Sequence, residues 1–397
     1  MINSAFIQHP YDWYHDLFKT QQRIRWMPEF FGGAWVLWHH ADITSVIRDE
    51  RLTTEKSGSM VSYYPPEYQR ELSQLSEYLG RWLAFIDPPK HIRIRKLLQA
   101  GFTPQVLAHF RPTVQQLVNE LLQPILAKHE CDFFHEFAYQ LPLYVVCAML
   151  GVPAQDYGLF MHWLDDMAHF IGNNQPPIEK ALKAKHAFDN LTAYFRDLLA
   201  RRRGQPGNDL ISILMRAEEG GDVLSADELY ANCIFFLFAG HETTSNLLGN
   251  GLYNLLRFPD QHTLLRQNPA LMPQFIEEAM RFDGPMQYTF RQAKVSFDLL
   301  GQTINAKDVL VFLFAAGNRD PHVYDHPEKF DITRSKNPQL TFGYGLHHCI
   351  GANIARMEAD LAFSAVLATM PDIRLIETPQ WSEVYRFRGL KGLKIAY

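Results

Sequence analysis

Apolar positions recur with helical spacing through most of the chain and with strand-like alternation near its two ends. Residues 90–278 are dominated by helical patterns, which proline and glycine residues interrupt. Near the amino terminus, segments 23–26 and 34–38 flank a pair of glycines and predict a β-hairpin, and residues 41–49 predict a short helix. The pattern therefore predicts a mainly α-helical protein with a smaller β-rich region.

Strand signals return toward the carboxyl terminus. Residues 294–304 alternate between apolar and polar and turn at Gly301, and residues 309–316 form an apolar run that is typical of a buried strand. Shorter strand candidates follow at 373–375, 384–388 and 394–396. Because nothing in the composition supports a division of the chain, we expect a single domain over residues 1–397.

The longest helical pattern begins with a capping box, in which Ser225 is followed by Glu228, and it continues to Arg257. At about 1.5 Å per residue, this helix is on the order of 45 Å long, enough to cross the molecule. Its centre reads LFAGHETTSN, where Gly240 lowers the helix propensity and polar residues interrupt an apolar run. Polar residues inside such a helix predict a buried polar site.

Two residues at this centre, Glu242 and Thr243, have two interpretations. They are either a solvated charge and a threonine bonded to its own helix, or a pair that delivers protons. The apolar character of the helix makes a solvated glutamate the weaker alternative. A zincin site is excluded, because the HExxH motif requires a second histidine where Ser245 stands.

Composition places the chain among ordinary globular proteins, with 47% hydrophobic and 13% aromatic residues. A formal net charge of -5 argues against nucleic-acid binding, and the dense basic cluster at residues 201–203 is interpreted as a solvated loop edge. The sequence shows neither the pattern of a signal peptide nor an apolar run of membrane-spanning length. We therefore expect a cytoplasmic protein with no membrane contact.

The cysteines exclude several kinds of site. They are Cys131, Cys147, Cys233 and Cys349, and no two of them form a CxxC pair. A zinc ribbon, a dithiol redox motif and a disulfide framework are therefore not expected. Cys147 and Cys233 lie in apolar runs, where cysteine behaves as a small core residue.

Cys349 differs from the other cysteines, because it lies in the glycine-rich segment FGYGLHHCIGANIAR just before a predicted helix over residues 350–370. Zinc would need further ligands at a recognised spacing, and His347 and His348 are too close in sequence to be placed as the base of a nucleophile. The amino end of a helix stabilises a thiolate through free N–H groups and the helix dipole. A buried, stabilised thiolate beside glycines is suited to bind iron under a flat macrocycle, so we expect Cys349 to be buried.

Two further pairs have the spacing of one helical turn. Glu278 and Arg281 stand at i and i+3 in FIEEAMRFDGP, where they form either a surface ion pair or a buried structural pair. His91 and Arg95 in DPPKHIRIRKLL share one helix face, either as an exposed basic face or as two donors for one anion. For neither pair does the spacing alone decide between the two interpretations.

Taken together, these segments resemble the cytochrome P-450 family of haem-thiolate monooxygenases. FGYGLHHCIG is similar to the haem-binding loop of that family, AGHETT to its oxygen-activation motif and EAMR to its ExxR helix. The similarity runs from about residue 85 to the end of the chain. The resemblance implies the cytochrome P-450 fold of the soluble bacterial type, with a long central helix over the haem.

The resemblance also implies which residues contact the cofactor. Cys349 would be the axial thiolate of haem b. The implied cofactor contacts are His91, Arg95, Ala239, Gly240, Arg291, Phe342, His347, Cys349 and Gly351. Among them, the two histidines and two arginines would bind the haem propionates.

Roles around the cofactor follow from the same resemblance. Glu242 and Thr243 would relay protons to bound dioxygen. Glu278 and Arg281 would join Arg334 in a structural network that holds the haem loop. Many relatives carry an aspartate where Glu242 stands, so the resemblance leaves the length of the proton path open.

The implied activity is the insertion of one oxygen atom of O2 into a hydrophobic organic substrate, by hydroxylation or epoxidation. Because the sequence has no flavin, nicotinamide or iron–sulfur signature, we expect electrons from a separate ferredoxin and ferredoxin reductase. Arg93, Lys96 and Arg356 are candidates to receive an acidic partner. We expect a monomer that acts on a natural-product intermediate and binds no nucleic acid.

Two alternatives remain on the same fold. One is a peroxide-driven peroxygenase or decarboxylase, and the other is a non-catalytic haem-based ligand sensor. Glu242 and Thr243 favour the O2-dependent monooxygenase, because neither alternative requires a proton relay.

Substrate candidates are apolar or aromatic residues in segments that line the pocket in relatives. They are Phe85, Ile86, Phe235, Met286, Tyr288 and Phe387, together with residues 60–68. Ordinary core packing is the alternative interpretation for each of them.

Overall fold

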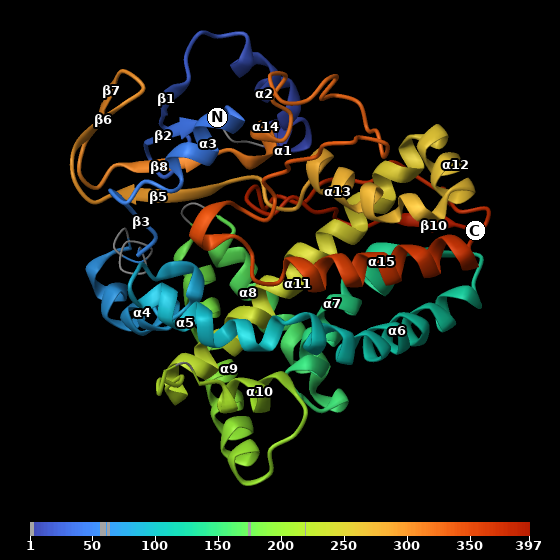
Figure 1. Cartoon of the computed structure of the whole chain (residues 1–397), viewed down its shortest axis with the longest axis horizontal. Helices are drawn as coiled ribbons and strands as arrows, with labels where there is room; N and C mark the ends of the chain where they lie inside the picture. Colours follow the sequence, from blue (N-terminus) through green and yellow to red (C-terminus); the bar gives the residue numbers. More distant parts are fainter. Residues whose placement is uncertain (1–3, 56–60, 62–63, 174–175, 219) are drawn as a thin grey trace. The chain divides into compact units, whose positions relative to one another are not determined.

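The backbone of the computed structural model forms two compact units, each built from several segments of the chain (Figure 1). The structure describes residues 4–55, 61, 64–173, 176–218 and 220–397. The first unit comprises Met1–Leu52, Val114–Pro142 and Glu242–Tyr397, and the second comprises Thr53–Thr113 and Leu143–His241. Helices α6 (Pro104–Leu126), α7 (Gln140–Met149) and α11 (Ala226–Arg257) contribute residues to both. A single domain over residues 1–397 stays a prediction.

The first unit contains a five-stranded sheet with the order β1-β2-β8-β5-β3. Its strands are β1 (Ile24–Met27), β2 (Ala34–Leu37), β3 (Leu52–Thr53), β5 (Thr289–Ala293) and β8 (Val309–Phe312). β1 and β2 are antiparallel with Ile24 opposite Leu37, which confirms the predicted hairpin. Gly32 in the connecting turn has a φ of 75°, a conformation that favours glycine. β8 runs parallel to β2 and antiparallel to β5, so distant parts of the sequence share one sheet.

Short helices lie beside this sheet in Figure 1. They are α1 (Ser4–Gln8), α2 (Pro10–Phe18), α3 (His40–Val46) and α14 (Phe314–Gly317). Tyr14 and Leu17 from α2 pack with Val36 and Val311 in one buried cluster. α3 ends before the predicted residue 49, because the chain turns there and Asp49 N donates to the carbonyl of Val46.

One predicted strand is too long, and another is absent. β8 ends at Phe312, and the rest of the 309–316 run forms α14, where Gly317 N donates to the carbonyl of Leu313. Residues 384–388 form no strand; within them Phe387 makes an isolated β-bridge with Met286. On one side of this bridge Pro285 has no N–H group to donate, and on the other side the carbonyl of Gln287 accepts from Ala315 N, so no ladder extends from it.

Other strand predictions are confirmed. β6 (Phe297–Leu299) and β7 (Gln302–Ile304) pair across a turn at Gly301, whose φ is 79°. The tail contains β9 (Arg374–Leu375) and β10 (Lys394–Ala396), and β10 pairs with both β9 and β4 (Glu130–Asp132).

The remaining helices of the first unit follow α11 in the sequence. They are α12 (Pro259–Gln267), α13 (Met272–Phe282) and α15 (Ala352–Thr369). α13 packs against α15, and the rings of Phe275 and Phe363 lie 4.9 Å apart. A Cβ added to Gly251 of α11 would lie 2.7 Å from the Phe363 ring, so this glycine allows α11 and α15 to approach closely.

The second unit is helical. Its complete helices are α4 (Pro66–Leu79), α5 (Lys90–Gln99), α8 (Tyr157–Ile171), α9 (Ile178–Gly204) and α10 (Leu210–Arg216). α8 and α9 pack against each other. α11 begins with the predicted capping box, in which Ser225 N donates to the Glu228 carboxylate and Glu228 N donates to Ser225 Oγ. Among the described residues, no helix has both the length and the apolar character needed to cross a membrane.

The basic cluster at residues 201–203 was predicted to be a loop edge. The structure places it instead in the last turn of α9. Positive side chains are favourable there, because the carboxyl end of a helix carries the negative end of its dipole. Arg202 is also fastened to the start of α10, where its Nε donates to the Asp209 carboxylate at 2.6 Å.

Candidate haem site

The segment around Cys349 is a closed loop that leads into α15. It contains a 3-10 turn at Gly345–His347, and α15 begins at Ala352. Cys349 N donates to the carbonyl of Phe342 at 2.8 Å, which closes the loop on itself. The cysteine is thus held by its own backbone just before the amino end of a helix.

The cysteines differ in their surroundings, and all four lie in the described part of the chain. Cys349 is exposed, so the expectation of a buried cysteine is wrong for this chain, whereas Cys131, Cys147 and Cys233 are buried. Burial raises the pKa of Cys131 to about 12 and also raises the pKa of Cys147 and of Cys233. A thiol kept neutral by burial is a poor metal ligand, so Cys349 is the cysteine suited to serve as a thiolate.

The glycines of this loop occupy their positions for different structural reasons. Gly343 and Gly345 have φ values of 73° and 74°, in the left-handed region that favours glycine. Gly345 also lies against Arg48, whose Cγ would be 2.9 Å from an added Cβ. At Gly351 an added Cβ would lie 3.8 Å from Cys349 Sγ, an ordinary contact. Turn geometry therefore accounts for the first two glycines, and Gly351 stays a predicted cofactor contact.

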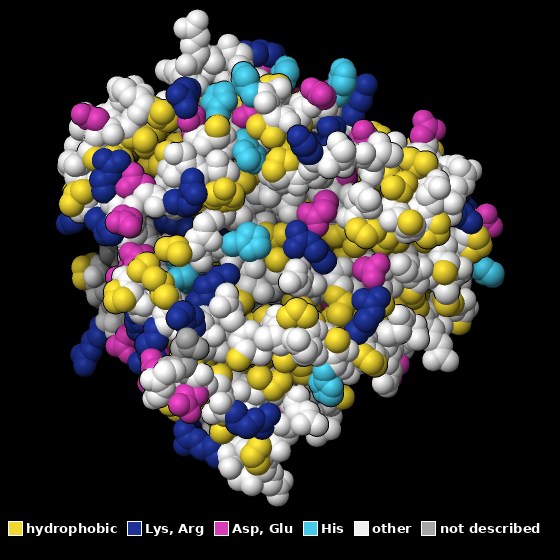
Figure 2. Space-filling model, in the orientation of Figure 1, with side chains coloured by type: hydrophobic (Ala, Val, Ile, Leu, Met, Phe, Trp, Pro, Cys, Tyr) yellow, Lys and Arg dark blue, Asp and Glu magenta, His cyan; other side chains and the backbone are white. Residues whose placement is uncertain are grey.

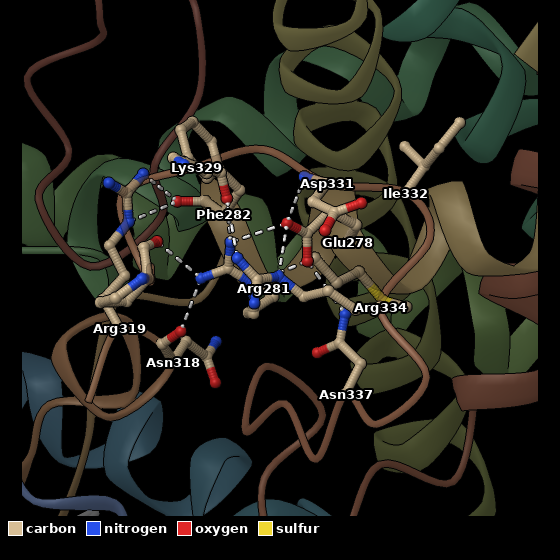
Figure 3. A network of polar contacts seen from close by, with 12 residues as sticks. Glu278, Arg281, Phe282, Asn318, Arg319, Lys329, Asp331, Ile332, Arg334 and Asn337 are labelled. Carbon is tan, nitrogen blue, oxygen red and sulfur yellow. Dashed lines mark hydrogen bonds and ion pairs between the residues drawn. The ribbon is translucent and has the colours of Figure 1, made fainter. Parts of the chain in front are cut away.

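Glu278 and Arg281 on α13 form a buried bidentate ion pair (Figure 3). Arg281 Nε and Nη2 donate to the two carboxylate oxygens, both at 2.7 Å, and neither side chain is exposed. Arg334 Nε donates to the same carboxylate at 3.1 Å. The side chain of Asn337 and the N–H of Asp331 donate to it as well. The buried structural pair is confirmed, and the surface pair is excluded.

The rest of the Arg281 guanidinium binds backbone carbonyls. It donates to the carbonyls of Asn318 at 3.0 Å, Pro327 at 2.9 Å and Lys329 at 2.8 Å. With the two bonds to Glu278, all five N–H groups of the guanidinium have acceptors. A buried charge is tolerated only when its hydrogen bonds are satisfied, so this network holds several loop segments at once.

Asn318 connects this network to the cysteine loop. Its side-chain oxygen accepts from Leu340 N at 2.6 Å, and its side-chain nitrogen donates to Thr341 Oγ1 at 3.0 Å. Leu340 and Thr341 directly precede Phe342, where the Cys349 loop closes. The buried ion pair therefore positions the start of the loop through one asparagine.

Glu242 and Thr243 lie half-buried on α11. Asn246 stands one turn later, and its side-chain nitrogen donates to Glu242 Oε1 at 3.0 Å. The glutamate is thus held against its own helix, which disfavours the interpretation as a freely solvated charge. The pair remains a candidate for proton delivery.

Gly240, one turn before Thr244 on the same helix, permits close helix packing in the second unit. A Cβ added there would lie 2.8 Å from Val146 Cγ2 on α7. The expectation that Ala239 and Gly240 also leave room for a ligand stays a prediction.

The structure reveals a row of asparagines on α11 that sequence reasoning missed. Asn250 donates to the carbonyls of Asp283 at 2.9 Å and Arg388 at 2.8 Å. Asn254 donates to the Asp283 carboxylate at 3.1 Å. Asn246, Asn250 and Asn254 recur every four residues, a spacing that marks one helix face in the sequence itself.

This row ends at a second buried ion pair. Arg388 Nε donates to the Asp283 carboxylate at 2.9 Å, and both side chains are buried. The Arg388 guanidinium also lies 3.5 Å from the centre of the Trp381 ring and donates to the carbonyl of Ile7. Burial alone would raise the pKa of Asp283, but the positive charges of Arg388 and Arg319 lower it below its usual value.

The predicted propionate donors divide between the two units. His91 and Arg95 lie one turn apart on α5 in the second unit, with His91 buried and Arg95 half-buried. A buried His91 excludes the interpretation of this pair as an exposed basic face. In the first unit, Arg291 is buried on β5 and donates to the carbonyl of Phe290, while His347 is half-buried in the 3-10 turn.

The substrate candidates of the first unit pack differently from one another. Tyr288 is buried, and its ring lies 5.5 Å from that of Phe30 and 5.4 Å from that of Tyr385. These contacts favour core packing for Tyr288. Phe387 is buried beside its bridge partner Met286, which is half-buried.

The substrate candidates of the second unit gather around Trp82. Its ring centre lies 6.0 Å from that of Phe85 and 5.1 Å from that of Phe235. Ile86 is buried, and its carbonyl accepts from Thr54 Oγ1. Of the candidate stretch 60–68, residues 60, 62 and 63 lie outside the described residues.

Arg93 and Arg356, which were expected to receive an acidic partner together with Lys96, form ion pairs within the chain. Arg93 pairs with Asp222 at 3.1 Å and with Glu228. Arg356 pairs with Glu277 at 2.5 Å. Lys96 is exposed.

The donor set fits a haem-thiolate cofactor. An exposed cysteine before a helix offers the soft anionic ligand that haem iron accepts. The buried cationic side chain of Arg291 and the buried imidazole of His91 are the kinds of donor that carboxylate groups require when they leave water.

Comparison with known proteins agrees with this chemistry. The family model named Cytochrome P450 matches residues 21–370. The chain is 33% identical to "Putative cytochrome P450 YjiB" of Bacillus subtilis (strain 168), and the match covers 99% of this chain and 95% of that one. It is 31% identical to "Biotin biosynthesis cytochrome P450" of the same organism, and that match covers 100% of this chain and 98% of the relative. A solved structure of P450BioI in complex with acyl carrier protein ligated to hexadec-9Z-enoic acid has a TM-score of 0.92 and 30% identity, covering 99% of this chain and 100% of that one.

Proposed function

The chain belongs to the cytochrome P450 family of haem-thiolate monooxygenases, and on that premise we propose that Cys349 is the axial ligand and that the substrate is a hydrophobic natural-product intermediate. The protein would insert one oxygen atom of O2 into that substrate. Its electrons would come from a separate ferredoxin and ferredoxin reductase.

The haem, when bound, supplies the activation of dioxygen. The residues of the chain position the cofactor and move protons. Cys349 would bind the iron, while His91, Arg95, Arg291 and His347 would bind the propionates by charge-assisted hydrogen bonds.

Glu242 would accept protons from solvent and pass them along Thr243, with Asn246 holding its carboxylate toward the helix face. The observation that carries the proposal is the connection of the exposed Cys349 loop to the buried Glu278–Arg281 pair through Asn318. A haem ligand must be held in a fixed position. A cysteine on a mobile surface loop would lack such a connection to a buried network.

The spectrum of the dithionite-reduced, carbon monoxide-bound protein tests the ligand. We expect the strongly red-shifted Soret band of thiolate ligation in the unmodified chain and in the control Cys131→Ala, and its loss in Cys349→His. A red-shifted band that survives in Cys349→His would overturn the assignment.

The proton relay has its own test. Thr243→Ala and Glu242→Gln should lower the yield of oxidised product per NAD(P)H consumed, measured with surrogate ferredoxin and reductase. Asn246→Ala should give a smaller loss, because it removes only the donor that holds Glu242. Equal yields in all variants, or turnover with hydrogen peroxide that matches turnover with O2, would favour the peroxide-driven alternative.

A carrier-bound acyl chain is a second substrate class, favoured by the similarity to P450BioI over the whole chain. That protein was solved with a fatty acyl group on acyl carrier protein. Titration of the ferric protein with palmitoleic acid and with palmitoleoyl acyl carrier protein separates the two classes by the spectral shift of the haem. Tighter binding of the free acid would argue against carrier delivery.

A further inference from the structure

Three side chains that could bind a metal come together in the first unit, and none of them is assigned to the haem. They are His39, Asp320 and His322. His39 directly precedes α3, and Asp320 and His322 follow α14. One imidazole nitrogen of each histidine and one carboxylate oxygen all lie within 4.8 Å of one another.

The carboxylate lies between the two imidazoles. His322 Nδ1 is 2.9 Å from Asp320 Oδ1, and His39 Nδ1 is 3.7 Å from Asp320 Oδ2. Asp320 is 2% exposed, His39 17% and His322 70%. The cluster therefore has a buried carboxylate at its base and opens to solvent at His322.

The backbone fixes the carboxylate in place. Asp320 accepts from His40 N and from His322 N, each at 2.9 Å. Burial alone would raise the pKa of Asp320, but hydrogen bonds from His39, His322 and these N–H groups lower it to about 2. The carboxylate is therefore held in place by N–H groups of both His40 and His322.

The ring of His39 is also oriented by its neighbours. It meets the Phe18 ring edge to face at 5.1 Å and lies 5.9 Å from the Trp38 ring. The neighbouring His40 is committed elsewhere, because its Nε2 lies 2.8 Å from the carbonyl of Pro338. Figure 2 shows histidine side chains gathered over the part of the molecule where Figure 1 places α2, α3 and α14.

A purely structural role would be enough to explain why Asp320 is buried, because its carboxylate accepts from two backbone N–H groups. It does not explain why His39, from a distant part of the sequence, directs Nδ1 toward the same carboxylate that the nearby His322 contacts. Imidazole and carboxylate are ligands that Zn²⁺ and similar divalent transition metals share.

We propose that His39, Asp320 and His322 form a binding site for Zn²⁺ or a similar divalent transition metal. Metal–ligand bonds of about 2.0–2.1 Å in a tetrahedron separate neighbouring ligand atoms by about 3.3 Å. One ligand atom from each of the three side chains lies within 4.8 Å of the other two. Small side-chain rotations complete the geometry, and a water supplies the fourth ligand at the exposed side. The metal fastens the start of α3 to the segment after α14.

Calorimetric titration of the haem-loaded protein with Zn²⁺ tests this site, after treatment with a chelator that leaves the haem bound. We expect one saturable equivalent in the unmodified protein and a loss of affinity of about 100-fold or more in His39→Gln and in His322→Gln, since loss of a direct ligand costs at least as much as loss of its outer partner. The matched control is His326→Gln, an exposed histidine of the same segment that pairs with Glu328 instead. It should bind Zn²⁺ with unchanged affinity.

Zinc-edge X-ray absorption of the one-equivalent complex gives a second readout, in which the imidazole scattering should fall in His322→Gln. The carbon monoxide spectrum of each variant verifies that it is folded and holds haem. Unchanged affinity in both ligand variants, several weak equivalents without a saturable one, or no binding at all overturns the proposal. Any of these results would leave the haem assignment intact, because the two sites share no residue.

Discussion

Two buried ion pairs each have their carboxylate near the end of α13, and they are built in opposite ways. Glu278 and Arg281 are three residues apart on one helix, whereas Asp283 and Arg388 are separated by 105 residues. The first pair anchors the loop of Cys349, and the second joins α11 to the carboxyl-terminal segment. A partner on the same helix can be recognised from spacing, while a partner from a distant segment is recognised only after the chain has folded.

The largest effect is expected at Arg281. In Arg281→Ala the free energy of unfolding should fall by about 3–5 kcal/mol, because the Glu278 charge stays buried and three carbonyls lose their donor. Urea unfolding followed by tryptophan fluorescence, together with haem content, measures this loss. Arg334→Ala is the matched control and should lose less, since Glu278 then keeps its bidentate partner. Equal losses in the two variants would mean that the bidentate pair is not the centre of the network.

A smaller loss is expected when the second pair is broken. Asp283→Ala should cost about 3 kcal/mol, since Arg388 would keep its contact with Trp381 and its bond to the carbonyl of Ile7. The double variant Asp283→Ala, Arg388→Leu should recover part of this loss, because it leaves no buried charge alone. If the two substitutions are additive in a double-mutant cycle, the pair is not energetically coupled.

The Asp283–Arg388 pair should also make the stability of the protein sensitive to acid. The folded pKa of Asp283 lies below its ordinary value of 3.8, so its contribution is present above that pH and is lost as the pH falls through the folded pKa. Below pH 3.8 the free energy of unfolding should therefore fall by up to about 1.4 kcal/mol per pH unit through this group. In Asp283→Asn this slope should be smaller. An unchanged slope would assign the acid sensitivity to other carboxylates.

The smallest effect is expected at an exposed ion pair. Arg201 and Asp197 lie 3.0 Å apart on α9, with side chains 53% and 68% exposed. Arg201→Ala should change the free energy of unfolding by less than about 0.5 kcal/mol, because solvent and salt screen the pair. A loss as large as that of Asp283→Ala would show that burial is not what separates the pairs.

The sequence predicted those parts of the site that depend on residues within one or two helical turns. The capping box at Ser225, the ExxR pair and the position of Cys349 before a helix all follow from short spacing. It also predicted that Arg334 joins Glu278, but only through family resemblance. Asn318, which connects the network to the cysteine loop, had no local signal at all.

The two strand predictions failed for the same reason, because their outcome depends on residues that are distant in the sequence. Residues 384–388 have the composition of a strand, but their neighbour in space contains Pro285, which cannot donate to a ladder. Residues 309–316 are apolar throughout, yet the strand ends at Phe312 and a helical turn follows. A strand is completed by the backbone that lies beside it, and local composition does not identify that backbone.

By itself, the sequence determined the helical body, the amino-terminal hairpin, the family and the cysteine suited to bind haem iron. The tertiary structure decided which distant groups meet: Asn318 with the cysteine loop, the α11 asparagines with Asp283 and Arg388, and His39 with Asp320. The physical reason is that local hydrogen bonds and capping depend on a few neighbouring residues. Buried polar groups, in contrast, take whichever partner the packed chain brings within reach.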